Sequence, residues 1–324
     1  MVSMTMAGMM AVQVETNDGT NAASPHVPVP VPDPLVEALN ALPNGWQDNP
    51  VEALVSLVTD NAELALPLAV QMAQASIESG DCETALGLLD AVIGGVEADG
   101  DDPASLHKNT GAEPLAFRNP FETALYSHMN GPDRPVHPVP VEMFGAYYLR
   151  GWLSFGTGLY EKAEQSLRTA AALNPTCCEP LFELAEIAKT RGDLDAFQTL
   201  TNRALAVAYT SGDLGRAYRS LAYLHAERAD YDLALALCFY SMVYDPGSGA
   251  AWSELAFIRE RTGKPLSEPS TDEIRSTLTA NGIQLGASDA VMTVAASLAQ
   301  DALASRQYED ALLACHILAD VSRG

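Results

Sequence analysis

The chain has 324 residues, 48% of them apolar, and a formal net charge of −24 from 18 Lys+Arg against 42 Asp+Glu. This length suits one large domain or two ordinary ones. The charge argues against nucleic acid or an anionic membrane as partners, because both are bound through Lys and Arg. Five cysteines without a disulfide spacing are typical of a protein with reduced thiols. No run reaches the roughly 20 apolar residues of a membrane span, so we expect a cytoplasmic protein.

The N-terminal part of the sequence predicts a tail followed by helices. Residues 1–34 end in a stretch with five prolines between positions 25 and 34, which favours an extended, disordered tail. From residue 35 onward, Ala and Leu recur at helical spacing. Within residues 35–96 the pattern predicts helices at 35–42, 50–60, 62–78 and 81–95.

Residues 97–143 interrupt the helical pattern. This insertion opens with an acidic run at 97–102 and closes with four prolines between 132 and 140. It predicts irregular chain with two or three short helices, for instance at 121–129. A long irregular segment inside a compact fold is usually functional or disordered, so the insertion is a candidate functional region.

A repeat of about 34 residues begins after the insertion. Its best copy, residues 144–177, contains Gly151, Tyr160, Ala163 and Pro175, and residues of the same kind recur in the following copies. This pattern resembles the tetratricopeptide repeat, in which each copy forms two antiparallel helices. Further copies begin at residues 178, 215 and 249, and weaker copies cover about 67–92 and 292–324.

The resemblance implies an all-α fold, a right-handed superhelical solenoid of tetratricopeptide-like helix pairs. Residues 35–96 would supply N-terminal helices with a degenerate repeat, 144–263 the central repeats, and 264–324 a linker and a capping repeat. Each helix pair leaves a face that only the next pair buries, so the stability of the stack is a sum over neighbours.

The resemblance also implies a binding groove lined by the first helix of each pair. Carried over position by position, the groove residues are Tyr148, Trp152, Phe155, Phe182, Glu186, Lys189, Arg216, Arg219, Tyr223, Phe257, Glu260 and Arg261. Aromatic and Arg side chains favour peptide anchoring and carboxylate pairing. The alternative is that the aromatic members only pack against neighbouring helices. The Lys–Asn–Arg carboxylate clamp of some family members does not carry over, because no Asn stands at the ninth position of any copy.

The expected function is a non-catalytic adaptor or co-chaperone-like module that binds a protein or peptide partner in this groove. A peptide-sensing regulatory receptor without a DNA-binding domain is the alternative, and self-association stays open. We also consider that the Pro-rich end of the insertion, 132–140, lies over the groove as a built-in ligand. An enzyme with its site in the insertion, near His128 or His137, is the third alternative.

The chain shows no recognised catalytic, nucleotide-binding or metal-binding motif, so we expect no catalytic residues, cofactor or metal. Three histidines of the insertion have spacings that fit no metal-ligand template. His225, His316, Cys238 and Cys315 fall at positions that predict packing roles in the repeats. The adjacent Cys177 and Cys178 lie in a turn, without a Lys or His beside them to favour the thiolate.

Overall fold

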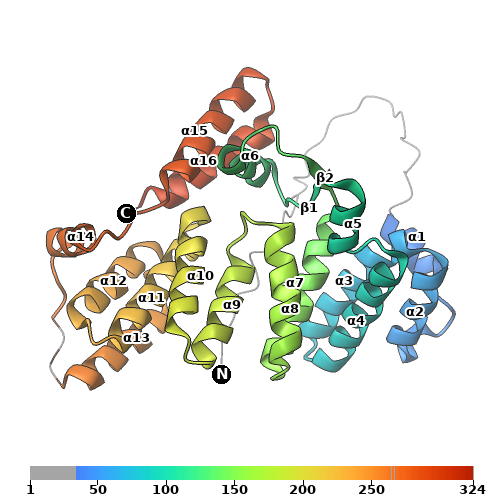
Figure 1. The fold of residues 1–324 in the computed structure, drawn as a ribbon, viewed down its shortest axis with the longest axis horizontal. Coiled ribbons are helices and arrows are strands. Elements are labelled where there is room, and N and C mark those ends of the chain that lie inside the picture. Colours follow the sequence, from blue (N-terminus) through green and yellow to red (C-terminus); the bar gives the residue numbers. More distant parts are fainter. Residues whose placement is uncertain (1–33, 264, 266, 324) are drawn as a thin grey trace, which may run out of the picture. The chain divides into compact units, whose positions relative to one another are not determined.

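The computed structural model describes residues 34–263, 265 and 267–323. The predicted tail, 1–34, therefore lies outside the described residues except for its last position. The described chain is predominantly α-helical, and its helices pack in successive antiparallel pairs (Figure 1), which confirms the all-α repeat fold. Among these residues, no helix combines the length and apolarity needed to cross a bilayer.

Four α-helices and one 3-10 turn, η2, form the N-terminal part, close to the predicted ranges. Their bounds are α1 Pro34–Ala41, η2 Trp46–Asp48, α2 Pro50–Asp60, α3 Ala62–Glu78 and α4 Cys82–Asp99. The side chains of Asn49, Asn61 and Asp81 each accept a backbone N–H of the first turn that follows, which fixes where α2, α3 and α4 begin. The interior of this part is apolar, with Leu54 and Leu88 fully buried.

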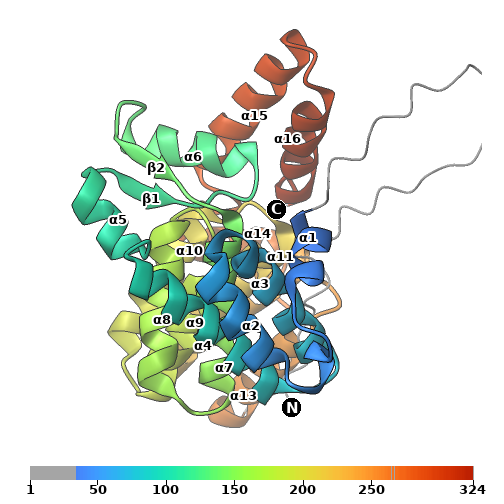
Figure 2. The same cartoon turned by 90° about the vertical axis from the view of Figure 1, so that its right-hand side faces the viewer.

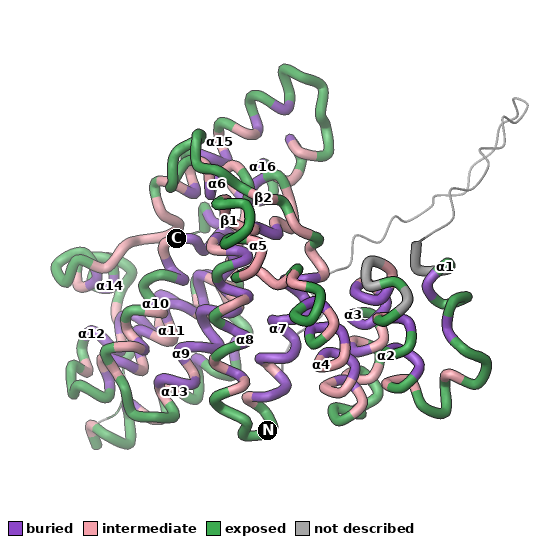
Figure 3. Tube along the Cα trace, turned by 45° about the vertical axis from the view of Figure 1, so that its right-hand side comes forward, coloured by how far each residue is buried: buried purple, intermediate pink, exposed green. Residues whose placement is uncertain are grey.

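The central repeats form three complete helix pairs and one single helix. Their bounds are α7 Val141–Gly156 with α8 Tyr160–Leu173, α9 Glu179–Thr190 with α10 Leu194–Val207, α11 Ser211–Glu227 with α12 Tyr231–Tyr244, and α13 Gly249–Thr262. Small residues let paired helices approach, because a Cβ on Gly151 would lie 2.6 Å from Leu167 Cγ. Buried residues recur along the paired helices (Figure 3).

The stack changes after α13, where the sequence pattern is lost. The next helix, α14 Thr271–Ala280, packs on α12. The connection that follows is held by Tyr218, whose hydroxyl donates to the Gln284 carbonyl at 2.8 Å and accepts the Gly286 N–H at 2.8 Å. The fourth copy thus supplies a first helix, while α14 takes a place beside the third copy.

The insertion contains two strands that the sequence did not predict. It consists of α5 Pro103–Thr110, β1 Glu113–Leu115, α6 Pro120–Asn130 and β2 Val136–Pro138. The helix at α6 agrees with the prediction for 121–129. The strands pair in parallel, with Glu113 opposite Val136, and α6 forms the crossover between them. Strands of three residues, each containing a proline, carry little signal in the sequence.

The placement expected for the Pro-rich end of the insertion is wrong. Part of it forms β2, which pairs with β1, and β1 contacts α8, the second helix of its repeat. The segment is therefore anchored on the side of a second helix, whereas the predicted groove is lined by first helices.

The C-terminal hairpin consists of α15 Asp289–Ala304 and α16 Tyr308–Val321. It contacts α6 of the insertion and α11 (Figure 2), and Asp320 accepts the Ser211 N–H at 2.6 Å. Cys238 is buried as predicted, and His225 is partly buried beside Asp230. The packing roles predicted for Cys315 and His316 are wrong, because both are exposed. The buried face of α16 carries Ala311, Ala314, Ile317 and Val321, and no further repeat covers the opposite face in the described chain.

Candidate functional site

The predicted groove residues lie on the first helices of successive repeats, α7, α9, α11 and α13. On α7, Tyr148 is only 2% exposed and stacks on Phe144 with ring centroids 6.0 Å apart. Trp152 and Phe155 are partly buried, and Phe155 packs on Tyr160. On α9, Phe182 is also 2% exposed. Packing is therefore the role that the structure shows for Tyr148 and Phe182, and the accessible surface belongs to the other residues.

Six of the predicted residues form three cation–aromatic pairs on α9, α11 and α13. We call this set the cation–aromatic row, and it comprises Phe182, Arg216, Lys189, Tyr223, Phe257 and Arg261. The Arg216 guanidinium lies 4.6 Å from the Phe182 ring centroid, the Lys189 ammonium 3.9 Å from that of Tyr223, and the Arg261 guanidinium 4.9 Å from that of Phe257.

Two of the three rings of the row also touch each other. Tyr223 stacks with Phe257 at 6.3 Å and meets Phe197 of α10 edge-on at 5.7 Å. Because Phe197 is 1% exposed, it fixes Tyr223 from beneath. Tyr223, Phe257 and the three cations remain partly accessible.

Carboxylates flank the row and neutralise its cations. Arg216 pairs with Glu183 at 2.9 Å, Lys189 lies 3.7 Å from Glu186, and Arg261 lies 3.4 Å from Glu227. Glu186 thereby joins the accessible surface near the row, and Glu260 is exposed on α13. A segment bound here meets aromatic faces bordered by alternating charges.

Arg219 takes a different position from the one expected. Its guanidinium pairs with Asp245 at 3.0 Å and is 15% exposed. Burial lowers the pKa of Arg219, and Asp245 opposes that effect. This side chain ties α11 to the end of α12 and offers little surface to a partner.

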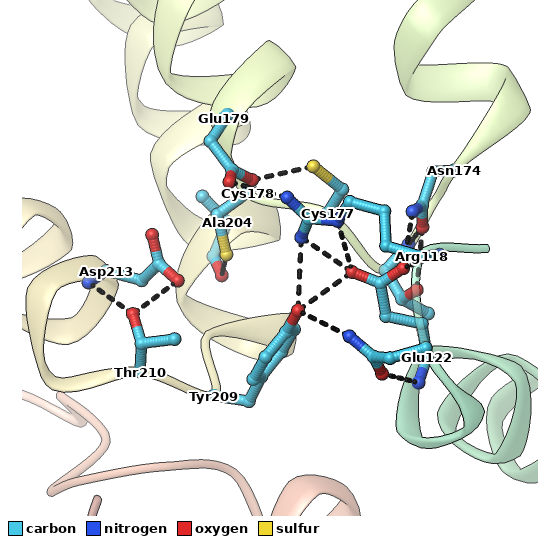
Figure 4. Close-up of polar contacts among 12 residues, drawn as sticks. Arg118, Glu122, Asn174, Cys177, Cys178, Glu179, Ala204, Tyr209, Thr210 and Asp213 are labelled. Atoms are coloured by element: carbon cyan, nitrogen blue, oxygen red, sulfur yellow. Dashed lines mark hydrogen bonds and ion pairs between the residues drawn. The ribbon is translucent and has the colours of Figure 1, made fainter. Parts of the chain in front are cut away.

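A buried polar cluster that sequence reasoning missed joins the insertion to the second repeat (Figure 4). At its centre the Glu122 carboxylate is fully buried on α6. It accepts hydrogen bonds from Arg118 Nε at 2.8 Å, Asn174 Nδ2 at 2.7 Å and the Tyr209 hydroxyl at 2.8 Å. Arg118 also donates to Glu179 at 2.8 Å, which stands at the first turn of α9. The cluster thus connects α6, the end of α8, the start of α9 and the end of α10.

The electrostatics of the cluster follow from burial and from the single guanidinium. Burial would raise the pKa of Glu179, but Arg118 and the Cys177 thiol outweigh it and lower that pKa. Burial, reinforced by the charge of Glu179, raises the pKa of Asp213 to about 7. Asp213 also accepts a hydrogen bond from Thr210 at 2.7 Å.

The adjacent cysteines belong to the same region and are poor nucleophiles. Both are buried. Cys177 donates its S–H to Glu179 at 2.6 Å and Cys178 to the Ala204 carbonyl at 3.3 Å. Burial, together with the charge of Glu179, raises the pKa of both thiols well above the ordinary value. A thiol held in its protonated form is unreactive.

One signal in the sequence pointed toward this cluster. Arg118 is one of only three Lys and Arg residues among the first 143, and Glu122 follows it by one helical turn. An isolated Arg in an acidic segment needs a carboxylate partner if it is buried, and Glu122 is the nearest along the chain. The contributions of Asn174, Glu179 and Tyr209 depend on tertiary structure.

Comparison with known proteins agrees with the repeat. Residues 144–177 match the family described as Tetratricopeptide repeat. No match was found among curated proteins.

Proposed function

We propose that this tetratricopeptide-repeat protein is a non-catalytic protein–protein interaction module that binds a peptide segment of a partner over the cation–aromatic row. The family match supports an interaction module in general. The observation that carries the finer proposal is the row itself, which spans three successive repeats with accessible rings and cations. Fold alone does not assign function.

The chemistry of the row suits a peptide better than a small metabolite. Tyr223 and Phe257 offer stacked aromatic surface, and their positions are fixed by Phe197 and by the cations. Rigid aromatic anchors lose little conformational entropy on binding, and Arg beside them pairs with carboxylates. Glu186 and Glu227 border the same surface, so basic side chains of the partner also find partners here.

The test is charge reversal at the accessible cations of the row. The double variant Lys189→Glu/Arg261→Glu and the wild type are used as baits in the native cell extract, and recovered proteins are compared by quantitative mass spectrometry. Each recovered protein is then titrated directly against both baits. We expect at least one partner to bind the wild type about tenfold or more tightly than the double variant.

The matched control is Arg306→Glu/Arg323→Glu. These two arginines are also exposed, and they belong to the C-terminal hairpin, which carries no residue of the row. Circular dichroism first establishes that all three proteins have the same helicity. Partners that bind the wild type and both double variants equally would show that the row is not the binding surface.

A further inference from the structure

A cleft of about 730 Å³ separates the insertion from the second helix of the first central repeat. Its floor is one face of α8, made by Gln165, Arg168, Thr169 and Ala172. The α5–α6 part of the insertion covers it, with Pro114 and Tyr126 contributing to the lining. The cleft lies mainly against second helices, and it shares no lining residue with the cation–aromatic row.

The lining of this cleft carries opposite charges from different helices. Glu97 comes from the end of α4 and Asp102 from the start of α5, whereas Arg203 comes from α10. In the stack, α4 contacts α7 and α8 contacts α9, so the α7–α8 pair stands between the helix that carries Glu97 and the pair that carries Arg203. The acidic and basic groups therefore reach the cleft from either side of α8.

These charges differ in how far they are already neutralised. Glu113 and Arg134 pair with each other, and Arg168 pairs with Glu164 outside the lining. Asp102 accepts the backbone N–H groups of Ala104 and Ser105. Among the described residues, the side chains of Glu97 and Arg203 make no hydrogen bond or ion pair. One carboxylate and one guanidinium are thus left for a ligand.

A buried phenol supplies a third polar group. Tyr147 lines the cleft, is 3% exposed, and its hydroxyl makes no hydrogen bond within the described part of the chain. Burial, together with the charge of Glu97, raises the pKa of Tyr147 to about 12, so the hydroxyl stays protonated and able to donate. Because Tyr147 lines the cleft and its hydroxyl is not among the buried polar atoms that lack a partner, this hydroxyl is accessible to a ligand in the cleft.

We propose that this cleft binds a short peptide, with its amino end toward Glu97 and its carboxylate toward Arg203. Its volume lies in the range that holds drug-sized ligands, which suits about three residues. The apolar lining, which includes Ala104, Pro114 and Ala172, accepts aliphatic side chains. The Tyr147 hydroxyl donates to a peptide carbonyl.

The probes are trileucine and its two matched forms, one acetylated at the amino end and one amidated at the carboxyl end. Binding to the full chain is titrated by nuclear magnetic resonance and by calorimetry. We expect trileucine to bind the wild type saturably at one site, and each blocked form about tenfold more weakly, because each loses one charged contact.

The variants assign each end of the peptide. Arg203→Gln should weaken the binding of trileucine about tenfold and leave the binding of the amidated form unchanged. Glu97→Gln should also weaken the binding of trileucine about tenfold, and it should leave the binding of the acetylated form unchanged. Tyr147→Phe should weaken the binding of all three peptides. Arg259→Gln, an exposed arginine on α13, is the control and should change nothing.

Two results overturn the proposal. One is the absence of saturable trileucine binding to the wild type. The other is binding that Glu97→Gln, Arg203→Gln and a cleft-filling Ala172→Trp variant leave unchanged, in proteins with wild-type circular dichroism. Neither result bears on the proposed function, because the row and the cleft are lined by different residues.

Discussion

Asp213 shows how burial and a neighbouring carboxylate act on one side chain. It stands in the first turn of α11 and accepts the Thr210 hydroxyl. Burial and the charge of Glu179 raise its pKa from 3.8 to about 7. Between these two values the folded protein retains a proton that the unfolded chain releases. The free energy of unfolding therefore decreases as pH rises through this window.

This pKa predicts the pH dependence of an Asp213→Asn variant. From pH 5 to pH 8 the wild type should lose roughly 2–3 kcal/mol relative to the variant, which cannot titrate at this position. Urea unfolding followed by circular dichroism at both pH values measures the difference. Asp195→Asn, at a side chain that is 95% exposed, is the control. A wild type-to-variant difference that is the same at both pH values would contradict the prediction.

At the scale of one helix pair, close packing depends on single glycines. Gly151 of α7 faces Leu167 of α8, where an added Cβ would lie 2.6 Å from Leu167 Cγ and 3.1 Å from its backbone nitrogen. The backbone nitrogen cannot move without displacing α8. By contrast, a Cβ on Gly156, at the end of the same helix, would meet nothing within 4 Å.

The two glycines therefore make a matched pair of substitutions. Gly151→Ala should lower the free energy of unfolding by about 1–3 kcal/mol, because overpacking separates α7 from α8. Gly156→Ala should be neutral or stabilising by up to about 1 kcal/mol, because alanine loses less backbone entropy on folding. Chemical denaturation of both variants measures the effect. Equal effects of the two substitutions would show that the close approach at Gly151 does not limit stability.

At the scale of the whole described chain, the insertion connects segments that are distant in sequence. Its helix α6 contacts α15 and α16, and Arg118 reaches Glu179 of α9 and Tyr209 after α10. Glu122 is fully buried and accepts hydrogen bonds from Arg118 and from the Tyr209 hydroxyl. A buried ion-pair network is weak evidence for high stability, but breaking it leaves an uncompensated charge.

Arg118→Met should therefore destabilise the protein by about 3–5 kcal/mol, because Glu122 and Glu179 lose their shared cation. Arg134→Met removes a cation of the same insertion whose side chain is 47% exposed, and it should cost less than about 1 kcal/mol. Urea unfolding gives both values. Hydrogen exchange then tests the location of the change, which should extend from α6 to α15. A loss confined to residues 113–138 would contradict the connecting role of Arg118.

Local signals in the sequence were sufficient to predict the helices and the repeat. Capping residues such as Asn49 and Asp81 mark where helices begin, and the spacing of Gly151, Tyr160, Ala163 and Pro175 marks one helix pair. These are local signals, because a cap acts within one turn and the repeat pattern records contacts between adjacent helices. Because these signals are local, they identify the first helix of each repeat, and these first helices carry the cation–aromatic row.

The contacts between segments far apart in the chain could be seen only in the folded protein. Arg118 meets Glu179 across 61 positions, and Cys315 and His316 are exposed because the terminal hairpin packs through its other face on α6 and α11. The same holds for the cleft, where Glu97 and Arg203 arrive from different repeats. Such contacts depend on how the insertion packs against the repeats. The periodic pattern of the sequence contains no information about that packing.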